Sequence, residues 1–152
     1  MDTLTTLLEQ AESERNQALA AFNLQRARCD AARAQAVQLD SYRSDYQQRW
    51  QSQFARGAAL EIVRCYRGFA DRLDTAIAQQ GQAVAQAQAG QVRGGDVLTP
   101  HELRVASVRK LIERRQEAEQ QRAERHERKA DDETAMRMAA RKQRSGFFSG
   151  RK

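Results

Sequence analysis

The sequence predicts an all-α protein that folds as one long antiparallel hairpin of two helices, paired as a coiled coil. Three observations favour this fold: the composition, a sustained 3.5-residue repeat of apolar side chains, and one short interruption at Gly57. Of the 152 residues, 26 are Ala and 19 are Gln, whereas only 1 is Pro and 8 are Gly. This composition favours long helices and argues against a compact α/β enzyme, which needs apolar strands and glycine-rich turns.

The first helix is expected over about residues 3–55. Positions spaced alternately by three and four residues are apolar in 11 of 14 cases, and such a repeat keeps one side of a helix facing a partner helix. Asp2 or Thr3 can cap the start of the helix. The repeat consists of Leu4, Leu8, Ala11, Arg15, Ala18, Phe22, Gln25, Cys29, Ala32, Ala36, Leu39, Arg43, Tyr46 and Trp50.

The second helix is expected over about residues 59–144, after a turn in which Gly57 ends the first helix. Its apolar repeat is Val63, Tyr66, Ala70, Leu73, Ile77, Gln80, Val84 and Ala87. A short connection between two amphipathic helices implies an antiparallel pair, in which residue i lies near residue 114 − i. Leu4 then lies near residue 110, and the apolar repeat ends at Leu111 and Ile112. Beyond it, 14 of the 21 residues in 113–133 are charged.

A cluster of helix-breaking residues interrupts the second helix: Gly90, Gly94, Gly95 and Pro100. Thr99 and Glu102 have the spacing of a capping box, with Pro at the first helical position. We therefore predict a break or kink between Gly90 and Thr99. It could be a hinge or a locally frayed helix.

The net charge of +6 is confined to the C-terminal tail. Residues 1–133 carry 20 acids and 20 bases, whereas residues 134–152 carry six bases and no acid. This distribution argues against a nucleic-acid groove spread over the fold. No apolar run is long enough to span a membrane and the N-terminus lacks the pattern of a secretory signal, so we expect one elongated, cytosolic domain over 1–152. The end of the 134–152 tail is expected to be disordered.

The residues offer no basis for enzymatic or cofactor chemistry. Cys29 and Cys65 have no CxxC spacing, and the register keeps them too far apart for a disulfide. His101 and His126 are isolated, so neither metal nor cofactor is expected. The carboxylates of a two-helix hairpin face solvent and have no cleft that could raise their pKa. The candidates for function are therefore surfaces.

Large aromatic side chains gather in the third of the hairpin next to the turn. Tyr42, Tyr46 and Trp50 are spaced by four residues on the first helix, and Tyr66, Phe69 and Leu73 follow on the second. Some of them build a local core, with Tyr46 and Leu73 the best candidates. Two paired helices bury only the narrow strip along which they meet, which we call the seam. This seam cannot hold Tyr42, Trp50 and Phe69 together, so part of this aromatic surface is expected to be exposed and adhesive.

Several segments resemble the flagellar export protein FliJ family, in order and over nearly the whole chain. The segment Leu39–Tyr46 is similar to the LxxYxxxY segment of that family, and Tyr66–Ile77 is similar to its YxxFxxxLxxAI run. The segments Lys110–Arg115 and Glu127–Glu133, followed by Arg137, Ala140 and Arg141, resemble its C-terminal half. The sequence departs from the family at Gly90–Pro100 and at Arg128, where the family usually has Gln.

The resemblance implies an antiparallel two-helix coiled coil without enzymatic activity, acting in flagellar type III protein export. Its implied partners are the hexameric export ATPase, the cytoplasmic domain of the export-gate membrane protein, and export chaperones. The implied location is the cytoplasmic face of the inner membrane, reached through these partners. The implied export-gate contact is Leu39, Tyr42, Tyr46, Phe69, Leu73 and Ala76. The implied ATPase contact is Leu4, Leu8, Arg114, Arg115, Arg122, Arg137 and Arg141.

Three alternatives stay open at this point. The stalk protein of an injectisome is a rod of the same shape, and such rods share function with little sequence similarity. A generic cytosolic coiled-coil scaffold has the same periodicity. A basic nucleic-acid binder is the third, although the confinement of the excess charge to the tail argues against it.

Overall fold

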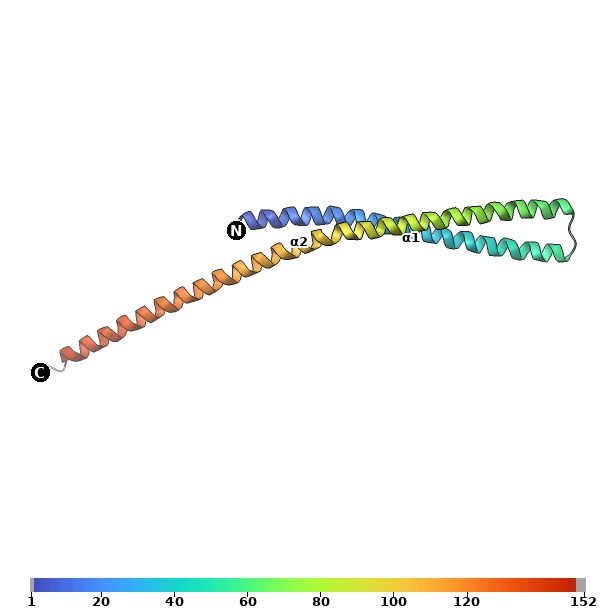
Figure 1. Cartoon of the computed structure of the whole chain (residues 1–152). Coiled ribbons are helices and arrows are strands. Elements are labelled where there is room, and N and C mark those ends of the chain that lie inside the picture. Colours follow the sequence, from blue (N-terminus) through green and yellow to red (C-terminus); the bar gives the residue numbers. More distant parts are fainter. Residues whose placement is uncertain (1, 150–152) are drawn as a thin grey trace. The chain divides into compact units, whose positions relative to one another are not determined.

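The computed structural model describes the backbone of residues 2–149 and the side chains of residues 3–146. It contains two helices, α1 (Asp2–Ala55) and α2 (Leu60–Ser149), and confirms the predicted all-α hairpin (Figure 1). Helix α2 ends five residues beyond the expected position 144. The contacts divide the chain into two units, Glu9–Val105 and Met1–Leu8 with Ala106–Lys152, which are described separately.

The connection between the helices is built around Gly57. Its φ is +88°, a left-handed conformation that glycine adopts without the steric cost that a Cβ would bring. The backbone N–H groups of Arg56 and Gly57 donate to the carbonyls of Gln53 and Phe54, each at 3.1 Å. These bonds satisfy carbonyls that the end of α1 leaves unpaired, so Gly57 ends the helix as the sequence predicts.

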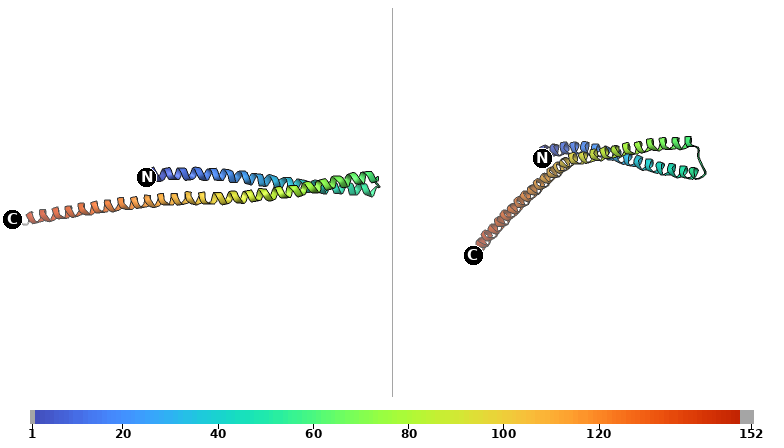
Figure 2. Two further views of the ribbon diagram at one scale, coloured as in Figure 1. Left: turned by 45° about the horizontal axis from the view of Figure 1, so that its top comes forward. Right: turned by 45° about the vertical axis from the view of Figure 1, so that its right-hand side comes forward.

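In the unit Glu9–Val105, the two helices run antiparallel and wind around each other in all three ribbon views (Figures 1 and 2). Three contacts give the register. Gln80 Nε2 donates to the carbonyl of Ala32 at 2.9 Å. Arg43 pairs with Asp74 at 2.5 Å, and Arg104 pairs with Glu14 at 3.1 Å. The numbers of the paired residues sum to between 112 and 118, close to the predicted 114.

The side chains that the helices bury follow the predicted repeat. Of the 14 repeat positions on α1, only Arg43 is exposed, and all eight repeat positions on α2 are buried or half-buried. The seam is nevertheless thin, because most of its members are half-buried. The buried apolar side chains are Ala11, Cys29, Leu73, Leu98, Val105 and Val108.

The predicted break between Gly90 and Thr99 is wrong, because α2 continues through the whole segment. The glycines serve helix packing instead. A Cβ on Gly94 would lie 3.5 Å from the Cα of Phe22, and one on Gly90 would lie 2.9 Å from Gln25 Oε1. Phe22 of α1 thus lies against α2 at Gly94, where a Cβ would make ordinary van der Waals contact and a longer side chain would overlap the ring. The apolar seam then continues to Leu98 and Val105, both buried.

The capping box at Thr99 is also wrong. The Thr99 hydroxyl donates to the Gly95 carbonyl at 2.9 Å, a bond made inside a helix rather than at its start. Pro100 lies within α2, where it removes one backbone hydrogen bond at an intrinsic cost of about 3 kcal/mol relative to Ala. Burial of Leu98 and Val105 on either side offsets this cost.

The unit that joins Met1–Leu8 to Ala106–Lys152 has a short packed part and a long exposed part. Val108 is buried, and Ile112 is half-buried, as are Leu4 and Leu8 of α1. Every residue of α2 from 113 to 146 is exposed. The apolar seam therefore ends at Ile112, as the sequence predicts. Neither helix, over its described residues, is long and apolar enough to cross a membrane.

Candidate interaction surfaces

The aromatic cluster consists of six rings from both helices, in the third of the hairpin next to the turn. Within it, Tyr46 lies against Phe69 with ring centroids 4.5 Å apart and against Tyr66 at 5.4 Å. Such distances are typical of favourable aromatic pairs. The members of the cluster are Tyr42, Tyr46, Trp50 and Phe54 on α1, and Tyr66 and Phe69 on α2.

Phe54 is the member that the sequence reasoning missed. Its ring lies 5.2 Å from Tyr66 and 5.4 Å from Trp50, so it closes the cluster at the turn. The signal that could have found it was its spacing, since Phe54 continues the four-residue series of Tyr42, Tyr46 and Trp50 by one more step. The predicted repeat stopped at Trp50 and therefore excluded it.

Tyr42 stands at the accessible edge of the aromatic cluster. Its side chain is 53% exposed, although its ring lies 6.3 Å from Phe69 and 6.4 Å from Tyr46. Leu39 and Tyr42 line a shallow hollow together with Gln80 and two further glutamines, Gln35 and Gln38. This edge combines an exposed ring, an apolar side chain and amide groups, as protein-binding surfaces often do.

The six residues of the predicted export-gate contact differ in their exposure. Tyr42, Tyr46 and Phe69 are brought together by ring contacts, and Leu39 adjoins Tyr42 in the hollow. Leu73 is only 7% exposed and belongs to the seam rather than to a surface. Leu39, Tyr46, Phe69 and Ala76 are half-buried. The part available to a partner is therefore centred on Tyr42.

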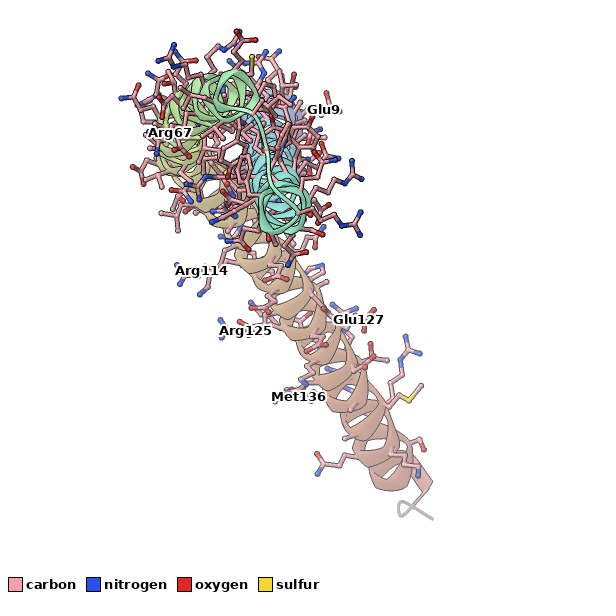
Figure 3. The ribbon with its side chains drawn as sticks, turned by 90° about the vertical axis from the view of Figure 1, so that its right-hand side faces the viewer. Glu9, Arg67, Arg114, Arg125, Glu127 and Met136 are labelled. Carbon is pink, nitrogen blue, oxygen red and sulfur yellow. The ribbon has the colours of Figure 1, made fainter. Side chains whose placement is uncertain are left out.

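The second candidate surface is the exposed segment of α2 after Ile112. Arg114, Arg115, Arg122, Arg137 and Arg141, all predicted for ATPase contact, are exposed there. Leu4 and Leu8, which are also predicted for the ATPase contact, are half-buried on α1 in the same unit. Among the described residues, no ion pair joins Glu124 to Arg128 or Lys129 to Glu133, although both pairs have the four-residue spacing that favours one. The charged side chains of this segment extend into solvent (Figure 3).

The remaining chemistry-bearing side chains are scattered. Cys29 is buried, Cys65 is exposed, and both are free thiols. His101 Nδ1 lies 3.9 Å from Glu14 Oε2, beside the pair of that carboxylate with Arg104. Within residues whose side chains are described, no three His, Cys, Asp or Glu side chains gather in a way that could hold a metal ion.

Comparison with known proteins identifies one family. A family model described as the flagellar FliJ protein matches residues 1–144 of the chain. No curated protein and no solved structure shows significant similarity to it. The matched range includes both the aromatic cluster and most of the exposed segment of α2.

Proposed function

The chain belongs to the FliJ family, and we propose that it works in flagellar protein export as a non-enzymatic stalk and escort protein. Family membership makes it a component related to flagellar export. Beyond that, the proposal is that it binds the hexameric export ATPase, contacts the export gate and escorts export chaperones. It would reach the cytoplasmic face of the inner membrane through these partners.

The observation that carries the ATPase part of the proposal is the uninterrupted exposure of α2 from residue 113 to residue 146. A helix that is exposed over 34 consecutive residues presents all its faces to an intermolecular partner. Its charged side chains suit a polar protein surface rather than a hydrophobic core. The proposed contact residues are Leu4, Leu8, Arg114, Arg115, Arg122, Arg137 and Arg141.

The export-gate part of the proposal is supported by the exposed edge of the aromatic cluster. Tyr42 combines an exposed ring with an adjacent hollow, and tyrosines in such settings are frequent anchors at protein interfaces. The proposed gate contact is Leu39, Tyr42, Tyr46, Phe69 and Ala76, with the buried Leu73 supporting it from inside. Chaperone escort is proposed on the family resemblance.

Binding to the export ATPase of the same flagellar system tests the proposal. The purified chain is expected to bind the ATPase and to raise its rate of ATP hydrolysis. The variant R114E/R115E/R122E is expected to lose both effects, while its helicity by circular dichroism stays at the wild-type level because all three side chains are exposed. Failure of the wild-type chain to bind the ATPase would contradict the stalk function and favour a generic coiled-coil scaffold.

The injectisome alternative makes a different prediction. Because the matching family is the flagellar one, binding is expected to be tighter to a flagellar export ATPase than to an injectisome ATPase. Equal or reversed preference would favour the injectisome function.

A further inference from the structure

The last part of α2 carries bases but no acid. Glu133 is the last acidic residue of the chain, and α2 continues from there to Ser149. We call residues 134–149 the tail helix. Its bases are exposed and, among the residues whose side chains are described, form no ion pair within the chain, so they are available to an anionic partner. The bases of the tail helix are Arg137, Arg141, Lys142 and Arg144.

These bases leave one side of the tail helix without charge. At about 100° per residue, they fall within an arc of about 160°. An arc of about 140° on the other side holds no charged residue, and we call it the uncharged face. Arg144 borders one edge of this face and Lys142 borders the other. Asp132 lies on the same side one turn earlier, so the face begins at residue 135. The described members of the uncharged face are Ala135, Met136, Ala139, Ala140, Gln143 and Gly146.

The tail helix also exposes apolar surface. Met136, on the uncharged face, is 73% exposed (Figure 3). Met138 is 65% exposed but lies about 200° further round the helix, among the bases. Phe147 follows Met136 by eleven residues, close to three helical turns, so its position in the helix falls on the uncharged face. The preceding residues 113–133 hold no apolar side chain larger than Ala. Positive charge and apolar surface therefore occur together only after Glu133 in this part of α2.

We propose that the tail helix lies on an anionic lipid surface, with its uncharged face toward the acyl chains. A helix with apolar residues on one face and Lys and Arg on the other lies in the plane of a bilayer interface in this way. The negative surface potential of an anionic bilayer attracts basic residues close to it. In the proposed function, protein partners bring the chain to the membrane. Here the chain's own residues touch the lipid, so the inference does not rest on those partners.

The bases that border the uncharged face are the ones that this contact needs most. The long side chains of Lys142 and Arg144 can reach the lipid phosphates while Met136 enters the apolar boundary. Arg137 and Arg141, which also belong to the proposed ATPase contact, lie on the side of the tail helix away from the uncharged face. The lipid contact therefore leaves these two bases to a protein partner.

A lipid surface explains this pattern better than a nucleic acid or an acidic protein surface. A polyanion attracts bases on any side of a helix. It gives no reason for one face without charge, nor for a methionine exposed on that face. A bilayer interface offers anionic phosphates and an apolar layer within the width of one helix. Both features of the tail helix then have a counterpart in the partner.

The two methionines provide matched variants for the test. M136Q and M138Q each replace one exposed methionine, and the two positions lie on opposite sides of the same helix. Binding of the full chain is measured by sedimentation with vesicles of phosphatidylcholine alone and of equimolar phosphatidylcholine and phosphatidylglycerol. The wild type is expected to bind the anionic vesicles and not the neutral ones. M136Q is expected to bind about fivefold more weakly, whereas M138Q stays within about twofold of the wild type.

A second pair of variants tests the charges. K142Q/R144Q is expected to weaken binding to the anionic vesicles about tenfold. R26Q/R28Q removes the same charge from exposed positions of α1 and is expected to stay within about twofold of the wild type. Circular dichroism checks that all variants keep the wild-type helicity.

Four outcomes would overturn the inference. The first is the absence of wild-type binding to anionic vesicles. The second is an equal effect of M136Q and M138Q, and the third is a loss in K142Q/R144Q with none in M136Q. Either of these would show attraction by charge alone, as for a nucleic acid or an acidic protein. The fourth is an equal loss in R26Q/R28Q, which would place the lipid contact on the hairpin. The vesicles contain no ATPase, so the stalk function is tested separately.

Discussion

Tyr42 and Tyr46 are one helical turn apart and have different environments. Tyr46 is half-buried and its ring contacts those of Tyr42, Trp50, Tyr66 and Phe69. Tyr42 is 53% exposed and its ring contacts only two others, at more than 6 Å. Packing energy is therefore concentrated at Tyr46, whereas Tyr42 is available to a partner.

These environments predict opposite effects of two similar substitutions. Tyr42→Ala is expected to weaken binding to the cytoplasmic domain of the export gate about tenfold, because it removes the anchor of the proposed gate contact, and to change the free energy of unfolding by less than about 0.5 kcal/mol. Tyr46→Ala is expected to lower that free energy by about 1–3 kcal/mol. Titration calorimetry and thermal unfolding measure the two quantities. A large loss of stability in Tyr42→Ala would make this ring part of the core.

Residue spacing predicted most of the aromatic cluster and the core positions of Tyr46 and Leu73, but not which of the other rings is exposed: Tyr42 is exposed, whereas Trp50 and Phe69 are half-buried. The four-residue spacing places Tyr42, Tyr46 and Trp50 on one side of α1. Whether each ring is covered depends on which side chain of α2 lies opposite, and spacing alone defines the register only to within a few residues. The family resemblance also carries no information on exposure, and it included Leu73, which is buried, in the implied export-gate contact.

At the scale of the helices, the glycines of α2 differ in how closely α1 approaches them. A Cβ on Gly81 would meet no atom of α1 within 4 Å, whereas a Cβ on Gly94 would lie 3.5 Å from the Phe22 backbone. The two glycines are on the same helix and differ in whether α1 lies close by. Only the second position is restricted in the size of its side chain.

This difference predicts opposite responses to one substitution. Gly81→Leu is expected to stabilise the protein by up to about 0.8 kcal/mol, because Leu is the better helix former. Gly94→Leu gains the same propensity, but its side chain beyond Cβ overlaps Phe22, with an expected net loss of about 1–2 kcal/mol. Chemical denaturation with circular dichroism measures both values. A gain at both positions would show that α1 and α2 are not closely packed at Phe22.

Local patterns predicted the helices well wherever a single repeat runs unbroken. The repeat on α1 from Leu4 to Trp50 can be recognised in the sequence without knowing which segment packs against it. The segment Gly90–Pro100 was misjudged because glycine and proline lower helix propensity locally, whereas the contact with Phe22 joins residues about 70 positions apart. That error also hid the continuation of the seam at Leu98, Val105 and Val108.

For the whole molecule, the distribution of charge matters more than its total. Residues 1–133 have no net charge, and the excess of six bases lies in residues 134–152. Arg137, Arg141, Lys142 and Arg144 are exposed on α2. Arg151 and Lys152, and the predicted disorder at the end of the tail, lie outside the described residues.

This distribution predicts weak binding to polyanions that depends only on the tail. The chain of residues 1–152 is expected to bind duplex DNA with a Kd above about 10 µM at about 0.15 M salt. R137Q/R141Q/K142Q/R144Q is expected to abolish the binding, because it removes four of the six tail bases. R26Q/R28Q/R33Q/R49Q removes the same charge from exposed positions of α1 and is expected to leave Kd within about twofold. Fluorescence anisotropy makes the comparison, and equal losses in both variants would place the polyanion site on the hairpin.

The contrast between the two thiols has a practical consequence. Cys29 is fully buried in the seam, whereas Cys65 is exposed near the turn, beside Tyr66 of the aromatic cluster. A thiol reacts with a maleimide only where the reagent can reach it. The native chain therefore offers one attachment point for a fluorescent dye or spin label, at the end of the hairpin farther from the charged segment in sequence. The distance from that end to a labelled partner can be measured without any engineered cysteine.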